Sequence, residues 1–163
     1  MRAGLLPGRE LERPLACALA RELRRSRALA RAGRMLARRD LSVHALDARL
    51  EAGGVAPAAR REALETLERA GLVDDGRFAV GRAELLAGRG HGDAAIRAEL
   101  ERQGVDPKLV AEAIAGLEPE RERAARIVGR RGRVPATARY LAARGFEAEA
   151  VEAALAGLVA GDV

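Results

Sequence analysis

The sequence predicts an all-α protein, organised as an elongated tandem array of three-helix repeats. Apolar residues make up 48% of the chain and are mostly Ala and Leu, and the charged 33% is mostly Arg and Glu. These four residue types are among the strongest helix formers, whereas Val, Ile, Phe, Tyr and Thr, which favour strands, are scarce. An internal repeat in the chain predicts the array.

The repeat is visible in three blocks, residues 50–55, 100–105 and 141–146, each of which reads Leu, three residues, Gly and then an apolar residue. Such self-similarity is typical of repeat architectures. The match continues eight, nine and twelve positions after that apolar residue. The matching positions are Ala63, Leu64 and Leu67; Ala113, Ile114 and Leu117; and Ala154, Leu155 and Leu158.

The chain divides accordingly into four parts. Residues 1–26 contain two prolines and do not match the repeat, so we expect an Arg-rich N-terminal tail with one short helix over 15–23. The repeats that follow are expected at residues 27–73, 74–118 and 119–159, of which the last is shortened. Because three short helices bury only a small core, neighbouring repeats are expected to stack or to be joined by short connections.

Each repeat begins with an apolar helix, followed by a second helix with one buried stripe and then a third. The first helices are marked by Leu29, Met35 and Leu36; by Phe78, Leu85 and Leu86; and by Ala124, Ile127 and Val128. The second helices are marked by Val43, Leu46 and Leu50, by Ile96 and Leu100, and by residues 134–144.

Glycine and proline set the ends of these helices. Gly54, Gly104 and Gly145 stand where a helix ends in a left-handed conformation, which costs about 1 kcal/mol for a residue with a Cβ atom. Pro57 and Pro107 open the third helices, since the first turn does not need their missing N–H. Asp106 is the expected N-cap of one of them.

The net charge of +5 is unevenly distributed along the chain. Residues 1–39 hold eleven Arg against three acids, residues 40–118 carry a net −5, and residues 119–146 hold eight Arg against two acids. Two clusters are candidate electrostatic contacts with DNA or with a partner protein: Arg24, Arg25 and Arg27, and Arg130, Arg131 and Arg133. The alternative is that these arginines only solvate helix faces.

The residues that carry enzymatic chemistry are few: two His, one Cys, two Ser, two Thr and one Lys. We therefore expect no catalytic, cofactor-binding or metal site, and a protein that is not an enzyme. Because Cys17 is the only cysteine in the sequence, an internal disulfide is excluded, which fits a cytoplasmic protein. The longest uncharged stretch, residues 153–161, is far short of the roughly 20 residues that span a membrane.

Three short motifs have both a chemical and a structural interpretation. Asp74 and Asp75 are a carboxylate pair but stand where a helix begins, and Ser42 likewise precedes a helix, so capping is expected for all three. The glycines of residues 88–92 suggest a phosphate-binding loop or a flexible connection. His44 and His91 lie in different repeats, so a surface role is expected for each.

Several of these segments together resemble the RecX family, the bacterial regulators of the RecA recombinase. The segments that carry the resemblance are residues 39–42, 71–79, 89–92, 96–105 and 139–146, and the resemblance covers about residues 28–158. It implies tandem three-helix repeats, binding in the groove of the RecA filament on DNA, and lowered RecA ATPase and strand exchange. The family-motif residues, expected to be mainly structural, are Asp74, Asp75, Arg77, Phe78, Gly104, Arg144, Gly145 and Phe146.

The resulting hypothesis is a monomeric, cytoplasmic, non-enzymatic modulator of recombination and DNA repair. It would lie across neighbouring RecA protomers, with its basic end repeats near DNA phosphates and its acidic middle repeat against protein. A helical DNA-binding regulator acting alone, with residues 134–144 in a groove, is the alternative, and a hydrolase or transferase ranks last.

Overall fold

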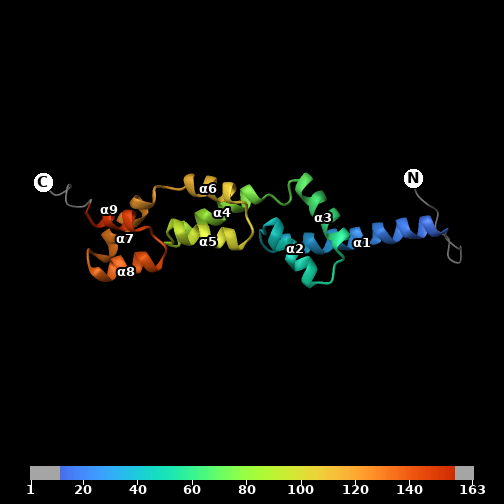
Figure 1. Ribbon diagram of the computed structural model, residues 1–163, viewed down its shortest axis with the longest axis horizontal. Helices are drawn as coiled ribbons and strands as arrows, with labels where there is room; N and C mark the ends of the chain where they lie inside the picture. Colours follow the sequence, from blue (N-terminus) through green and yellow to red (C-terminus); the bar gives the residue numbers. More distant parts are fainter. Residues whose placement is uncertain (1–11, 157–163) are drawn as a thin grey trace. The chain divides into compact units, whose positions relative to one another are not determined.

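The computed structural model describes residues 12–156, and every regular element in that part is an α-helix, as the sequence predicts (Figure 1). In chain order the helices are α1 (Arg13–Leu36), α2 (Val43–Ala52), α3 (Pro57–Arg69), α4 (Asp75–Gly88), α5 (Asp93–Arg102), α6 (Pro107–Ala115), α7 (Glu120–Arg131), α8 (Pro135–Ala143) and α9 (Ala148–Ala156).

The helices belong to two compact units. Of the described residues, the first unit contains 12–40 together with Leu46–Val73, and the second contains Leu41–Ala45 together with residues 74–156. The division passes through α2, whose first residues belong to the second unit. The bounds expected for the three repeats remain a prediction.

Helix α1 is longer than expected. The predicted tail with a short helix over 15–23 is wrong for the described residues, because one helix of 24 residues runs from Arg13 to Leu36 across the expected boundary at residue 26. Pro14 lies in its first turn, where the missing N–H is tolerated, and no Gly or Pro interrupts residues 15–32. Residues 1–11 of the expected tail lie outside the described residues.

The first unit packs α1 against α3 through small side chains. Ala28 of α1 clusters with Ala59 and Ala63 of α3, and Leu29 and Val55 pack against them half-buried. The stripe predicted on α1 from its larger apolar residues is thus only half-buried, because alanines allow the two helices to approach closely.

The second unit contains two apolar clusters. One joins α4, α5 and α6 through eight buried residues, with Phe78 and Leu109 packed against it. The other joins α7, α8 and α9 and contains Ile127, Leu141 and Phe146. Each cluster is thus built by three consecutive helices, the arrangement that the repeat predicts.

The predicted glycine turns are present. Gly54, Gly104 and Gly145 have φ values of +74°, +74° and +79°. In each turn the N–H of the following residue donates to the carbonyl five residues back, as from Phe146 to Leu141 at 3.1 Å, and the Gly N–H donates to the carbonyl three residues back. This is the Schellman motif, which satisfies carbonyls that the helix end leaves unpaired.

Candidate basic interface

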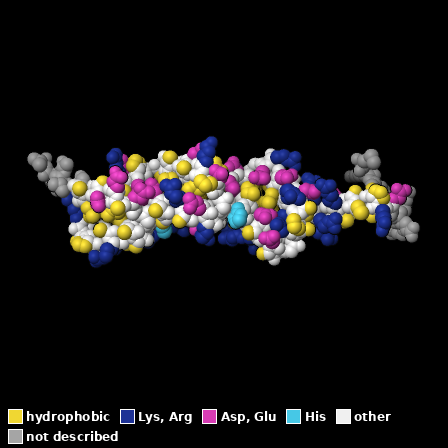
Figure 2. Space-filling model, in the orientation of Figure 1, with side chains coloured by type: hydrophobic (Ala, Val, Ile, Leu, Met, Phe, Trp, Pro, Cys, Tyr) yellow, Lys and Arg dark blue, Asp and Glu magenta, His cyan; other side chains and the backbone are white. Residues whose placement is uncertain are grey.

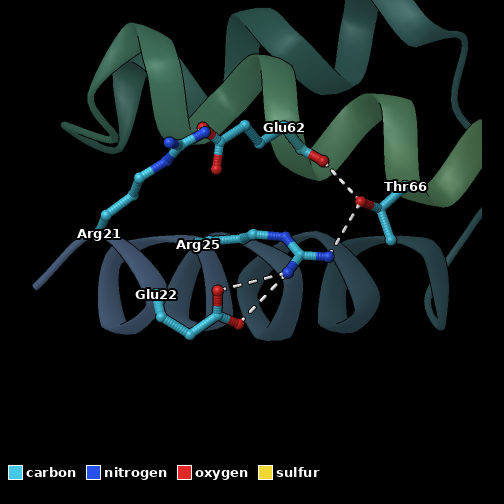
Figure 3. Close-up of polar contacts among 5 residues, drawn as sticks. All are labelled: Arg21, Glu22, Arg25, Glu62 and Thr66. Carbon is cyan, nitrogen blue, oxygen red and sulfur yellow. Dashed lines mark hydrogen bonds and ion pairs between the residues drawn. The ribbon is translucent and has the colours of Figure 1, made fainter. Parts of the chain in front are cut away.

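The predicted basic residues Arg24, Arg25 and Arg27 lie on α1 in the first unit. Arg24 and Arg27 are exposed and make no hydrogen bond or ion pair with the described residues. Arg25 differs, because its guanidinium contacts the Glu22 carboxylate at 3.3 Å and Thr66 Oγ1 of α3 at 3.5 Å (Figure 3). Two of these three arginines are therefore free for a partner, whereas the third binds α1 to α3.

A second polar contact next to Arg25 also joins these helices. Arg21 Nε and Nη2 both donate to Glu62 Oε1 of α3, at 2.9 and 2.5 Å (Figure 3). The contact raises the pKa of Arg21, chiefly through the hydrogen bond to Glu62. Lys and Arg side chains are visible over α1 in Figure 2. The exposed basic face of α1 thus lies next to a row of ion pairs that are part of the fold.

A hollow of about 410 Å³ lies between α1 and α3. Cys17, Arg21, Arg24 and Glu62 contribute to its lining, together with alanines. Glu62, the only carboxylate among the described residues that line it, already binds Arg21. The hollow therefore contains a thiol and arginines without a free acid or base beside them.

The second predicted cluster lies in the second unit, where α7 ends and α8 begins. Arg130, Arg131 and Arg133 are all exposed, and Gly132 between them has a φ value of +83°. Arg130 Nε donates to the Arg126 carbonyl at 3.3 Å, and Arg133 makes no hydrogen bond or ion pair with the described residues. The structure groups these side chains but leaves their charge uncompensated nearby.

Arg131 is positioned by an aromatic ring. Its Cζ atom lies 4.0 Å from the centroid of Tyr140, and that of Arg144 lies 5.3 Å from the same centroid. Arginine stacks on aromatic faces with its N–H edge still available. Sequence reasoning missed Tyr140 here, because no local pattern joins it to an arginine nine residues away.

The two aspartates of the family motif are caps. Asp74 Oδ1 accepts the N–H of Arg77 at 2.9 Å at the start of α4, as predicted. Asp75 Oδ1 instead accepts the N–H of Val43 at 2.8 Å, at the start of α2. Ser42, beside Val43, accepts the N–H of Ala45 at 3.1 Å and donates its hydroxyl to the Gln103 carbonyl at 2.5 Å.

The other motif residues lie in turns or the core. Phe78 is half-buried against the α4–α6 cluster, and Phe146 is buried in the α7–α9 cluster. A Cβ atom on Gly104 would meet the His44 ring, and one on Gly145 would lie 2.6 Å from the Ala95 Cβ atom. These residues have packing roles, whereas Arg144 of the same turn is half-buried and donates to the Arg89 carbonyl.

The glycine-rich loop at residues 88–92 is explained by packing against the turn after α8. The N–H of Gly92 donates to the Arg144 carbonyl at 2.9 Å, and the N–H of Ala94 donates to the Gly145 carbonyl at 3.1 Å. A Cβ atom on Gly92 would overlap the backbone of Gly145 and Phe146. A close approach of two backbones therefore accounts for this glycine.

Arg123 is a buried charge that sequence reasoning missed. Only 5% of it is exposed, and it donates to the carbonyls of Glu118 and His91, both at 2.9 Å, and to the carboxylate of Asp93. Its Cζ atom also lies 5.9 Å from the Phe146 ring. The signal in the sequence is its place four residues before Ile127, on the apolar face of α7.

His91 lies among arginines. Its pKa is lowered, first by burial and then by the charges of Arg144, Arg89 and Arg82. Arg144 Nη1 lies 3.4 Å from His91 Nε2, and it also donates to the Arg89 carbonyl at 3.4 Å. His91 is therefore uncharged at neutral pH and sits in a region of positive potential.

The described residues contain no cluster of three or more His, Cys, Asp or Glu side chains that could hold a metal ion. Within the same residues, no helix is both long and apolar enough to cross a membrane. The polar groups that are brought together are thus arginines, carbonyls and capping carboxylates.

Residues 74–114 match the family model described as "RecX, second three-helix domain". Among curated proteins, the regulatory protein RecX of Chromohalobacter salexigens is 39% identical over 132 residues, which are 76% of this chain and 87% of that protein. The regulatory protein RecX of Xanthomonas axonopodis pv. citri is 35% identical over 130 residues, 74% of this chain and 80% of that protein.

Solved structures show the same fold. A crystal structure of a regulatory protein RecX has a TM-score of 0.76 at 19% identity, covering 91% of this chain and 81% of that one. The crystal structure of RecX from Lactobacillus salivarius has a TM-score of 0.74 at 14% identity, covering 83% and 97%. Sequence identity, coverage and fold agree, and the chain belongs to the RecX family of regulatory proteins.

Proposed function

We propose that this chain binds the RecA filament on DNA and lowers its ATPase and strand-exchange activity, acting by contact and not as an enzyme. The observation that carries the proposal is the similarity to regulatory proteins RecX at 39% identity over 132 residues. The partner and the direction of the effect are those that the resemblance of the motif segments implies.

The contacts of the polar residues support action by binding. Ser42, Asp74, Asp75 and Asp106, the residue types from which nucleophiles and acid–base groups are drawn, each accept a backbone N–H at the start of a helix. A side chain that caps a helix loses its cap when it turns toward a substrate. These groups therefore stabilise the fold, and we expect exposed charged side chains to recognise the partner.

The two basic clusters are the proposed contacts with DNA phosphates or acidic RecA surface. Arg24, Arg27, Arg130, Arg131 and Arg133 are exposed, and none of them forms an ion pair with a described residue. Exposed, unpaired arginines release condensed counterions when they meet phosphates, so binding should weaken steeply with salt. Arg25 is expected to contribute less, because Glu22 and Thr66 already hold it.

The acidic part of the chain is the proposed protein-facing region. Residues 40–118 carry a net charge of −5, and Glu84, Glu101 and Glu112 are exposed there. The negative charge of this region disfavours contact with DNA, which is also negative, and favours contact with a basic protein surface. The protein is proposed to act as a monomer that lies across neighbouring RecA protomers.

The test is the ATPase rate of RecA on single-stranded DNA with increasing amounts of this protein. A fall in rate that saturates is expected. Alanine at Arg24, Arg27, Arg130 and Arg133 together should raise the half-inhibiting concentration. The matched control has alanine at Arg13, Arg34, Arg38 and Arg121, which removes the same charge from exposed positions outside the clusters and outside residues 40–118.

An unchanged ATPase rate at saturating protein would overturn the proposal. An equal rise in the half-inhibiting concentration for the two sets of substitutions would show that inhibition depends on overall charge, and would contradict a specific role of the two clusters. Tight DNA binding without any effect on RecA would favour the alternative, a DNA-binding regulator that acts alone.

A further inference from the structure

We propose that Arg131, stacked on Tyr140, forms with Arg144 a binding site for successive phosphates of a nucleic-acid backbone. The site lies in the second unit and rests on the part of the proposed function that brings DNA to this chain. It assigns contact to Arg131 and Arg144, and it makes Tyr140 a positioning residue.

The guanidinium of Arg131 is both oriented and unoccupied. Its Cζ atom lies 4.0 Å from the Tyr140 centroid, which is stacking distance. Arg131 is exposed and makes no hydrogen bond or ion pair with any described residue, so its N–H donors are available to a ligand. A stacked guanidinium loses less side-chain freedom on binding than an arginine that moves freely in solvent.

Arg144, which is half-buried and donates through Nη1 to the Arg89 carbonyl at 3.4 Å, supplies a second positive charge near the same ring. Its Cζ atom lies 5.3 Å from the same ring centroid, which places the two Cζ atoms within about 9 Å of each other. A nucleic-acid strand in a duplex carries one negative charge for every ~3.4 Å along the axis. Because each strand also winds around this axis, successive phosphates lie farther apart than the axial rise, and two arginines within about 9 Å of each other can contact successive phosphates of one strand.

The charge around the stack favours a polyanion over a mixed protein surface. Residues 123–146 contain seven Arg and no Asp or Glu, and among the described residues only Arg123 and Arg126 of these arginines pair with acids, Asp93 and Glu118. The pKa of His91 is lowered first by burial and then by the charges of Arg144, Arg89 and Arg82, which add positive potential around His91. An acidic protein patch usually carries both signs of charge, whereas a phosphate backbone matches an uninterrupted positive surface.

The mode of recognition follows from the stack. Because Arg131 stacks on the half-buried Tyr140 ring, the face that it covers is not free to stack a base. Contacts to phosphates carry no direct sequence information. Binding through this site is therefore independent of sequence and depends on the backbone alone.

The experiment measures DNA binding in the absence of RecA. A fluorescein-labelled oligo(dT) of about 30 nucleotides and a duplex of mixed sequence are titrated with the protein at several KCl concentrations. The variants are Arg131→Ala, Arg131→Lys, Tyr140→Phe and Tyr140→Leu. The control is Arg121→Ala, an exposed arginine ten residues earlier on α7, about 15 Å along the helix axis.

Arg131→Ala should weaken binding about tenfold at low salt, because it removes charge-assisted hydrogen bonds to phosphate. It should also reduce the slope of log K against log salt by about 0.7 on the single strand and about 0.9 on the duplex for each lost phosphate contact. Tyr140→Leu should reproduce most of this loss of DNA affinity without removing a charge, whereas Tyr140→Phe should retain the affinity. The affinity of Arg131→Lys should lie between that of the unaltered protein and that of Arg131→Ala.

A spectroscopic signature reports on the ring directly. Tyr140 is the only tyrosine in the sequence, so 3-fluorotyrosine labelling gives a single fluorine resonance. Oligo(dT) should shift this resonance in the otherwise unaltered protein and leave it in place in Arg131→Ala. An unshifted resonance at saturating DNA would overturn the site.

Two further results would also overturn it: Tyr140→Leu binding as tightly as Tyr140→Phe, or Arg121→Ala losing as much affinity as Arg131→Ala. Because no RecA is present, the outcome is separate from that of the ATPase assay. DNA binding through the stack together with an unchanged RecA rate would support this site and contradict the proposed function.

Discussion

Replacement of Arg123 by alanine should destabilise the second unit more than any surface substitution in it. The guanidinium is 5% exposed and satisfies the Glu118 and His91 carbonyls and the Asp93 carboxylate. Removal of one partner of a buried, hydrogen-bonded ion pair costs about 3–5 kcal/mol, because the remaining polar groups stay buried without partners. With a urea m-value of about 2 kcal/mol/M, this loss lowers the unfolding midpoint by about 2 M.

The assay is urea denaturation followed by the emission of Tyr140. The sequence has no Trp and no other Tyr, so this signal reports unfolding around α8 in the second unit. Arg123→Lys keeps the charge but reaches fewer of the three acceptors, and should lose an intermediate amount. Arg121→Ala is the control, since its side chain is 72% exposed and its ion pair with Glu122 is 4.0 Å long.

The control should change the free energy of unfolding by no more than about 0.5 kcal/mol. A midpoint shift below about 0.5 M for Arg123→Ala, with an unchanged m-value, would refute the reasoning. An equal shift for Arg121→Ala would refute it as well, because the loss would then follow charge and not burial.

The remaining predictions concern a turn, a cap and a histidine. Gly145→Ala should lower the free energy of unfolding in urea by roughly 2–4 kcal/mol, because φ is +79° and the new Cβ atom would press on α5. Gly129→Ala, on the exposed side of α7 with open space, should instead raise it by about 0.5–1 kcal/mol. Equal effects of the two substitutions would contradict the role of the Gly145 turn. Asp75→Ala removes the acceptor of the Val43 N–H and should lower the free energy of unfolding by about 1 kcal/mol. Asp75→Asn keeps an acceptor and should lower it less. An unchanged free energy of unfolding in Asp75→Ala would show that this cap does not stabilise the fold. The pKa of His91 is lowered below the ordinary histidine value of 6.5, so the unfolded chain binds a proton more readily than the folded one. The free energy of unfolding should therefore fall as the pH drops from 6.5 toward the folded pKa. His91→Gln should remove this pH dependence, and an unchanged dependence would place its origin elsewhere.

The local features of the fold are readable from the sequence. The turns at Gly54, Gly104 and Gly145, and the caps at Ser42 and Asp106, depend on residues within five positions of each other. Their residue types satisfy backbone groups at helix ends almost independently of the rest of the chain. The all-α class follows because composition and apolar spacing agree over the whole chain.

Contacts between distant residues are not readable in this way. Asp75 caps a helix that begins 32 positions earlier, and Ser42 binds a carbonyl 61 positions later. Composition alone does not tell which arginine of a cluster is engaged, so Arg25, held by Thr66, looks the same as Arg24 in the sequence. The burial of Arg123 likewise depends on partners in two loops.

Sedimentation of RecA filaments assembled on single-stranded DNA tests most directly whether this chain acts by binding them. The chain should sediment with the filaments in an amount that rises with the number of RecA protomers and then saturates, beyond what the same DNA binds without RecA. A chain that stays in the supernatant, or that saturates per filament whatever its length, would contradict binding across neighbouring protomers.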